Sequence, residues 1–100
     1  MISFLNPTQR FSVNVSPAPD WRSSDSVRIE AIKAGSLFER QHPQGVEMKW
    51  QDVYRALALQ ININDHQLAS MAKGLELGRT LRFNLKCSRS DLEAAGFIDS

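Results

Sequence analysis

The sequence predicts an α+β fold that is mainly helical, with three to four helices and a small strand pair formed by residues 10–16 and 80–87. Apolar residues recur at helical spacing through the middle of the chain, and one segment near each end alternates apolar and polar residues as a half-buried strand does. The length of 100 residues suffices for one hydrophobic core. If either alternation does not form a strand, the alternative is an all-α fold with an extended N-terminal arm.

Residues 1–25 differ in composition from the rest of the chain. They are rich in Ser, Pro and Asn, and the prolines at positions 7, 17 and 19 exclude a continuous helix. Within this segment, Phe11 to Ser16 alternates apolar and polar side chains, which predicts a strand. We therefore expect an extended N-terminal arm over residues 1–25 and a compact, mainly helical domain over residues 26–100.

A helical pattern begins at the cluster Ser24-Asp25-Ser26, whose side chains can cap a helix N-terminus. An apolar stripe follows at i, i+4, i+7 and i+11, made of Val27, Ala31, Ala34 and Phe38. This spacing predicts a helix that ends at His42-Pro43, because proline disfavours the α conformation in the residue before it.

The next helix has the clearest apolar stripe in the chain, made of Trp50, Val53, Tyr54, Leu57 and Ile61. Its start stays open, because Val46, Met48 and Trp50 also alternate with polar residues, so that the helix could begin near Gln51 or Asp52. The first few residues of this region would then be extended.

A third helix is predicted after the capping-box pair Asn64 and Gln67. Its apolar face runs from Leu68 to Leu75, and Gly78 is placed to take the left-handed conformation just past its last turn. These three signals agree on one helix of about three turns.

The period changes after Gly78. Four apolar residues then alternate with polar ones, namely Leu81, Phe83, Leu85 and Cys87. This pattern predicts a strand that pairs with Phe11–Ser16, since a strand without a neighbour leaves its backbone groups unpaired. Ser90 and Glu93 form a second capping-box pair, which predicts a short last helix over Asp91–Ala95, ended by Gly96.

The charge composition is balanced. Twelve Lys and Arg residues against eleven Asp and Glu residues leave a formal net charge of +1, so no global field steers the protein toward nucleic acid or an anionic membrane. The first ten residues lack the order of a secretory signal, and no apolar run approaches the length of a membrane span. A single cysteine excludes an internal disulfide. We expect a cytoplasmic protein that does not bind membranes.

Residues for catalysis, metal binding or cofactor binding are not predicted. His42 and His66 have no third ligand at metal spacing, and the chain carries no glycine-rich phosphate loop and no nucleophile elbow. Cys87 lies on the apolar side of the predicted strand, which favours a buried structural thiol over a nucleophile. We therefore expect that the protein is not an enzyme and takes no cofactor or metal.

The surplus of large apolar residues favours a protein-binding function. Interfaces are enriched in aromatic residues, and the candidates for partner binding are Trp21, Trp50, Tyr54, Phe97 and Ile98. The hypothesis is a small regulator that inhibits a larger protein, such as an anti-activator that binds a transcription regulator or an effector complex. A homodimer formed through the strand or the arm is a further partner that the sequence leaves open.

One segment is locally basic, and it supports the alternative function of a nucleic-acid-binding regulator. Between positions 73 and 89 a single acid, Glu76, faces five basic residues, namely Lys73, Arg79, Arg82, Lys86 and Arg89. Such a strip suits a phosphate backbone, with binding that weakens as salt rises. The segment has no interleaved aromatic residues on its basic side, which single-strand binders use for stacking, and this favours a solvated outer face over a nucleic-acid site.

Overall fold

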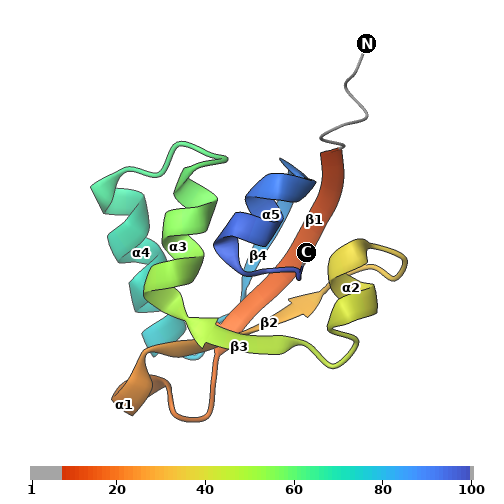
Figure 1. The fold of residues 1–100 in the computed structure, drawn as a ribbon. Coiled ribbons are helices and arrows are strands. Elements are labelled where there is room, and N and C mark those ends of the chain that lie inside the picture. The colour runs from red at the N-terminus through yellow and green to blue at the C-terminus, as the bar shows by residue number, and fades with distance from the viewer. Residues whose placement is uncertain (1–7, 100) are drawn as a thin grey trace.

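The computed structural model describes residues 8–99, which form a four-stranded antiparallel sheet with five short helices (Figure 1). The strands are β1 (Thr8–Pro17), β2 (Ser26–Ala31), β3 (Val46–Lys49) and β4 (Leu81–Ser88). The helices are α1 (Trp21–Ser24), α2 (Leu37–Gln41), α3 (Trp50–Ala58), α4 (Asp65–Glu76) and α5 (Arg89–Ala95). Helices account for 40% of these residues and strands for 30%, so the prediction of a mainly helical fold is wrong.

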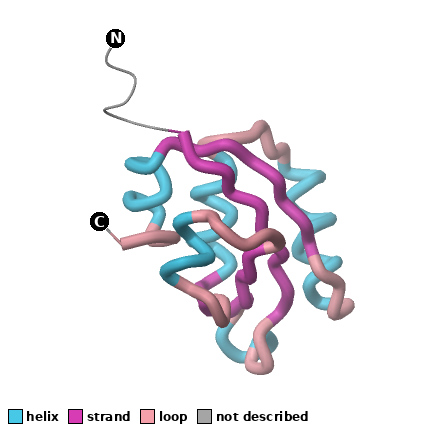
Figure 2. The backbone as a smooth tube through the Cα atoms, turned by 90° about the vertical axis from the view of Figure 1, so that its right-hand side faces the viewer, coloured by secondary structure: helices cyan, strands magenta, loops and turns pink. Residues whose placement is uncertain are grey.

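The sheet has the strand order β3-β2-β1-β4, and every neighbouring pair is antiparallel. The predicted pairing of the two alternating segments is confirmed, since β1 and β4 pair from Thr8 opposite Ser88 to Val15 opposite Leu81. This pair is not a separate small ribbon but half of a larger sheet. Figure 2 shows the four strands as a curved and twisted sheet rather than a flat one.

The helix predicted between Ser24 and His42 is wrong, because this region forms β2 and the five-residue α2. Val27 and Phe38 are buried as the helical stripe requires, but Ile29 is also fully buried and lies outside that stripe. The segment Ser26–Ala31 alternates polar and apolar residues as well, so two periods compete in the same sequence. The strand period prevails because β1 and β3 provide hydrogen-bonding partners on both sides of β2.

The all-α alternative with an extended arm is excluded by the same sheet. β1 lies between β2 and β4, so the part of the predicted arm that the structure describes supplies an interior strand. Residues 1–7 of that arm lie outside the described part of the chain. The fourth strand, β3, takes up the extended conformation that the alternation of Val46 and Met48 left open, and α3 begins directly after it at Trp50.

The predicted helix ends mostly agree with the structure, but the start of the last helix differs. In α4, Asn64 and Gln67 form the reciprocal capping box, with N···O distances of 2.8 and 3.0 Å. Gly96 takes the left-handed conformation at the end of α5. The cap of α5 is Ser88 rather than Ser90, because the helix begins two residues earlier than predicted and the Ser88 hydroxyl accepts the Asp91 N–H at 3.1 Å.

The core lies on one face of the sheet. Residues directly opposite in an antiparallel pair share a face, so Phe11, Val13 and Val15 of β1 project to the same side as Phe83 and Val27 on the flanking strands. These side chains are buried together with those of α2, α3, α4 and α5. The polar side chains that alternate with them point to the other face. Within residues 8–99, no helix has the length and apolar character that crossing a bilayer requires.

Candidate binding surfaces

Three of the five residues predicted to bind a partner are part of the core. Trp50, Phe97 and Ile98 are 7%, 3% and 2% exposed. The Phe97 ring packs against Phe11 with 4.6 Å between ring centroids, and Phe11 in turn meets Phe38 edge to face. The side chains of Trp50, Phe97 and Ile98 are thus packed in the core of the described chain.

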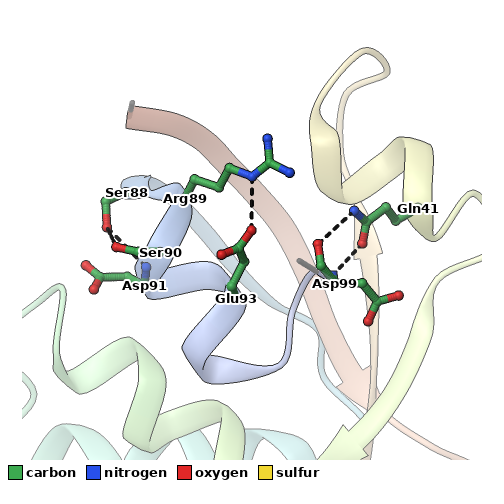
Figure 3. Close-up of polar contacts among 7 residues, drawn as sticks. All are labelled: Gln41, Ser88, Arg89, Ser90, Asp91, Glu93 and Asp99. Carbon is green, nitrogen blue, oxygen red and sulfur yellow. Dashed lines mark hydrogen bonds and ion pairs between the residues drawn. The ribbon is translucent and has the colours of Figure 1, made fainter. Parts of the chain in front are cut away.

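The C-terminal segment is held in place by α2. Gln41 donates to the Asp99 carbonyl at 3.3 Å and accepts the Asp99 N–H at 2.7 Å (Figure 3). The ring of His42 lies 3.0 Å from the Phe97 carbonyl, measured at Nε2. These contacts explain why the apolar tail folds back onto the sheet instead of reaching outward.

The other two predicted residues, Trp21 and Tyr54, are partly exposed and lie in different places. Trp21 begins α1, beside the loop that follows β1, and borders a hollow shared with the end of α4. Tyr54 lies on α3, where its ring is 5.8 Å from that of Trp50. The structure therefore does not bring the five residues into one surface.

A groove of about 810 Å³ runs beside Tyr54, between α3 and α5. We call it the α3–α5 groove, and its lining is Met48, Asp52, Tyr54, Arg55, Ala56, Ala58, Leu59, Asp91, Ala94, Ala95 and Gly96. Figure 1 shows the two helices side by side. Leu59 is 80% exposed, the highest value for a large apolar side chain in the described chain. The groove is therefore an apolar surface that this fold leaves open.

Leu59 was missed by sequence reasoning because it lies outside the apolar stripe of α3. That position is itself the signal that could have identified it, since a leucine on the polar side of an amphipathic helix has no place in the core. The alanines at positions 58, 94 and 95 were missed for a different reason. Small residues carry no periodic signal of their own, and only the packing of α3 against α5 brings them together.

The face of the sheet opposite the core carries polar and charged side chains, and we call it the open face. Its β2–β3 half, the mixed half, carries Arg28, Glu30, Glu47 and Lys49. Arg28 lies 3.8 Å from the Glu30 carboxylate and 4.0 Å from that of Glu47, and it also donates to the Gln44 carbonyl. Positive and negative charges are balanced in this half.

The β1–β4 half of the open face is basic, and we call it the basic half. It carries Arg10, Arg82 and Lys86, together with the neutral side chains of Thr8, Ser12, Asn14, Ser16, Asn84 and Ser88. Arg10 is directly opposite Lys86, and Arg82 is opposite Asn14. Neither β1 nor β4 carries an acidic residue, so these three exposed cations have no carboxylate partner on their own strands.

The predicted basic strip is thus divided by the fold. Arg82 and Lys86 share the basic half, while Lys73 lies on α4 and Arg79 lies in the loop before β4. Arg89 begins α5, where its Nε pairs with the Glu93 carboxylate at 3.0 Å (Figure 3). Arg10 was missed because it is far away in sequence. The register of the predicted strand pair was the signal that could have placed it beside Lys86.

Cys87, the one cysteine in the sequence, lies on the core side of β4. Cys87 is buried, and burial raises the pKa of its thiol, with a smaller contribution from the negative charge of Asp91. Residues 8–99 contain no cluster of three His, Cys, Asp or Glu side chains arranged to hold a metal ion. Two surfaces of the described chain thus stand out, the apolar α3–α5 groove and the charged basic half.

Comparison with protein-family models, characterised proteins and solved structures found no match to this chain. Functional inference therefore depends on the two surfaces themselves.

Proposed function

We propose that the protein is a non-catalytic regulator that acts by binding another protein in the α3–α5 groove. The observation that carries this proposal is the exposure of Leu59 beside an apolar groove of about 810 Å³. A contiguous apolar surface of this kind on a small domain is typical of an interaction site. Most of the groove lining is apolar, which supports contact with an apolar side chain of a partner.

The shape of the groove favours an amphipathic helix as the bound segment. Its walls are two helices, and alanines at positions 58, 94 and 95 leave room for large apolar side chains between them. A helix that presents apolar residues at i, i+3 or i+4, and i+7 fits such a groove. Asp52 and Asp91 place two carboxylates at the groove against the single cation of Arg55, which favours basic residues flanking the apolar ones.

The test compares two leucines with matched positions. Leu59 and Leu77 both follow the last residue of a helix, α3 and α4 respectively, and both are exposed, but only Leu59 lines the groove. The full chain carrying Leu59→Ser or Leu77→Ser would be immobilised beside the wild type, and proteins retained from an extract of producing cells would be quantified. Binding of each purified candidate would then be measured by calorimetry.

We expect a partner that wild type and Leu77→Ser bind equally and that Leu59→Ser binds at least about tenfold more weakly, because a buried leucine contributes about 1.5–3 kcal/mol. A partner that binds all three chains equally contradicts the groove as its site. Equal loss in both variants contradicts it as well, since Leu77 lies outside the groove. Circular dichroism of both variants checks that the fold is unchanged.

A further inference from the structure

We propose that the outer edge of β4 binds an extended acidic segment of another protein, which adds to the sheet as a fifth strand. This site is separate from the α3–α5 groove and does not depend on it. The proposal combines the direction of the β4 backbone groups with the charge of the side chains that alternate along the same strand.

The direction of the backbone groups follows from the neighbouring strands. The Ser12 carbonyl accepts the Ile32 N–H at 3.0 Å, and the Ala18 N–H donates to the Ser26 carbonyl at 3.1 Å. The backbone N–H and C=O groups of even-numbered residues of β1 therefore point toward β2. The backbone N–H and C=O groups of odd-numbered residues of β1 point toward β4, where they pair with those of odd-numbered residues. It follows that Arg82, Asn84 and Lys86 direct their N–H and C=O groups away from β1.

No other strand of the described chain pairs with that outer edge. β4 is the last strand of the sheet, it is eight residues long, and among residues 8–99 it pairs only with β1. Exposed edges of this length can template a further strand, which is how many extended peptides are recognised. The backbone of β4 thus supplies a row of donors and acceptors for a partner segment.

The side chains of the same residues select the charge of that segment. Arg82 and Lys86 are exposed on the open face, four residues apart, which places them about 13 Å from each other along β4. Side chains of an added strand would lie directly opposite them at about 5 Å. Acidic side chains at those positions would pair with both cations. They would also be attracted by Arg10, which lies on β1 directly opposite Lys86.

The alternate residues of the segment are predicted to be apolar. The other side of β4 carries Leu81 and Leu85, which are only partly buried at this edge of the core. Apolar side chains of an added strand would cover them and extend the core outward by one strand. The site therefore fits a segment that alternates acidic and apolar residues.

A second copy of this chain is a poor occupant of the same edge. Two β4 strands paired antiparallel and centred on Asn84 would place Arg82 of each copy opposite Lys86 of the other, and like charges in that position are destabilising. If the pair is centred on Leu85 instead, the two Lys86 side chains become diagonal neighbours, and their like charges repel. The basic residues thus disfavour self-association while favouring an acidic partner.

Protection of the edge against aggregation explains part of this pattern but not all of it. Lysine and arginine on an edge strand commonly serve that purpose, and Arg82 and Lys86 fit it. Arg10 does not, because it lies on an interior strand directly opposite Lys86, where the two like charges repel. A third cation in that position is useful when the ligand is acidic.

Nucleic acid is less well matched to this surface than an acidic peptide. The open-face side chains of β1 and β4 include no aromatic residue on which a base could stack. The free backbone edge also has no partner in a phosphate chain, which lacks the alternating donors and acceptors of a strand. Nucleic acid is therefore one arm of the test rather than the proposed ligand.

The test uses the full chain and a synthetic peptide of the length of β4 in which glutamate and valine alternate. Two further peptides carry N-methyl groups on the glutamate nitrogens or on the valine nitrogens, so that each loses the hydrogen-bond donors along one edge only. In an antiparallel added strand the glutamate N–H groups face β4. We expect methylation of the glutamates to weaken binding at least tenfold and methylation of the valines to leave it within about twofold of the parent peptide.

The protein variants test the charges with a matched control. Arg82→Glu with Lys86→Glu should weaken binding at least tenfold, whereas Arg40→Glu with Lys73→Glu makes the same change in net charge on two exposed helical residues and should leave binding unchanged. Leu59→Ser should bind the peptide like the wild type, so failure of this site is distinguishable from failure of the groove. Amide exchange at Arg82 and Asn84 should slow when the peptide is bound.

Four outcomes would overturn the proposal. Equal binding of the two methylated peptides would show attraction between side chains without strand addition. Tighter binding of a single-stranded DNA oligonucleotide than of the peptide would identify a phosphate site. Sedimentation of the free chain as a dimer that Lys86→Glu alters would identify a second copy as the occupant. Absence of binding to the parent peptide at low salt would remove the site altogether.

Discussion

The two halves of the open face differ in how their charged side chains are paired. In the mixed half, Arg28 lies between the carboxylates of Glu30 and Glu47 and also contacts the Gln44 carbonyl. In the basic half, Arg10 and Lys86 lie opposite each other with no carboxylate on either strand. The mixed half thus pairs its charges internally, whereas the cations of the basic half have no carboxylate partner on β1 or β4.

The nearly neutral chain carries a locally charged surface. The net charge of +1 is the sum of compensated and uncompensated regions. Ion pairs on an exposed sheet contribute little to stability individually, so a fold tolerates one half without them.

The largest expected effect concerns Cys87, on the core side of β4. Because the thiol is buried and burial raises its pKa above the ordinary value of 9.0, alkylation at pH 8 should be at least about a hundredfold slower than in the unfolded chain. A saturating concentration of the glutamate–valine peptide should slow the alkylation of Cys87 further, because an added strand holds β4 in place. Rapid alkylation of the folded chain would show that β4 opens readily and is a poor template.

The same thiol makes stability depend on alkaline pH. The pKa of Cys87 is higher in the folded chain than in the unfolded chain, so its contribution is fully present below pH 9 and is lost as pH rises through the folded pKa. Denaturant titrations of wild type and Cys87→Ala between pH 7 and pH 11 would measure this. The difference between the two chains should shrink as pH rises.

A second large effect is expected at Gly45, which supports the mixed half. Its φ is +80°, and a Cβ there would lie 2.8 Å from the Ile29 carbonyl oxygen and 2.9 Å from the Glu30 side chain. Gly45→Ala should lower the free energy of unfolding by more than about 2 kcal/mol, through the strained backbone and the close approach.

Gly35→Ala is the matched control for this change. Gly35 has a φ of +94°, but a Cβ there would meet no atom within 4 Å. Gly35→Ala should therefore lower the free energy of unfolding by about 1–2 kcal/mol, through the backbone conformation alone. Equal losses in both variants, measured by urea denaturation, would show that the close approach of Gly45 to β2 contributes nothing.

The elements with a single clear period could be predicted from the sequence. The alternation of β4, the stripe of α3 and the capping box of α4 each favoured one element, although the all-α alternative and the start of α3 were left open, and the structure contains all three elements. The region between Ser24 and His42 fits two periods, that of a helix and that of a strand. Val27 and Ala31 fit a helical stripe and a strand equally well, and the choice depended on pairing with β1 and β3, which no local pattern contains.

The candidate surfaces were predictable to a smaller degree. Arg82 and Lys86 were placed on one face from sequence, because the strand period fixes which side chains share a side. The burial of Phe97 depends on how the C-terminal tail packs, and a hydrophobic residue near a terminus has no sequence mark that tells a core position from a surface one.

The most direct test of the contrast between the halves is the free energy of unfolding of Lys86→Glu, with Arg28→Glu as reference, at low and high salt. Lys86→Glu replaces a like-charge pair with Arg10 by an opposite pair and should stabilise the free chain by about 0.2–1 kcal/mol, while Arg28→Glu gathers three carboxylates and should destabilise it. Both effects should shrink at high salt. If Lys86→Glu instead destabilises the chain, the basic half serves the fold, and the claim that it is held for an acidic ligand is contradicted.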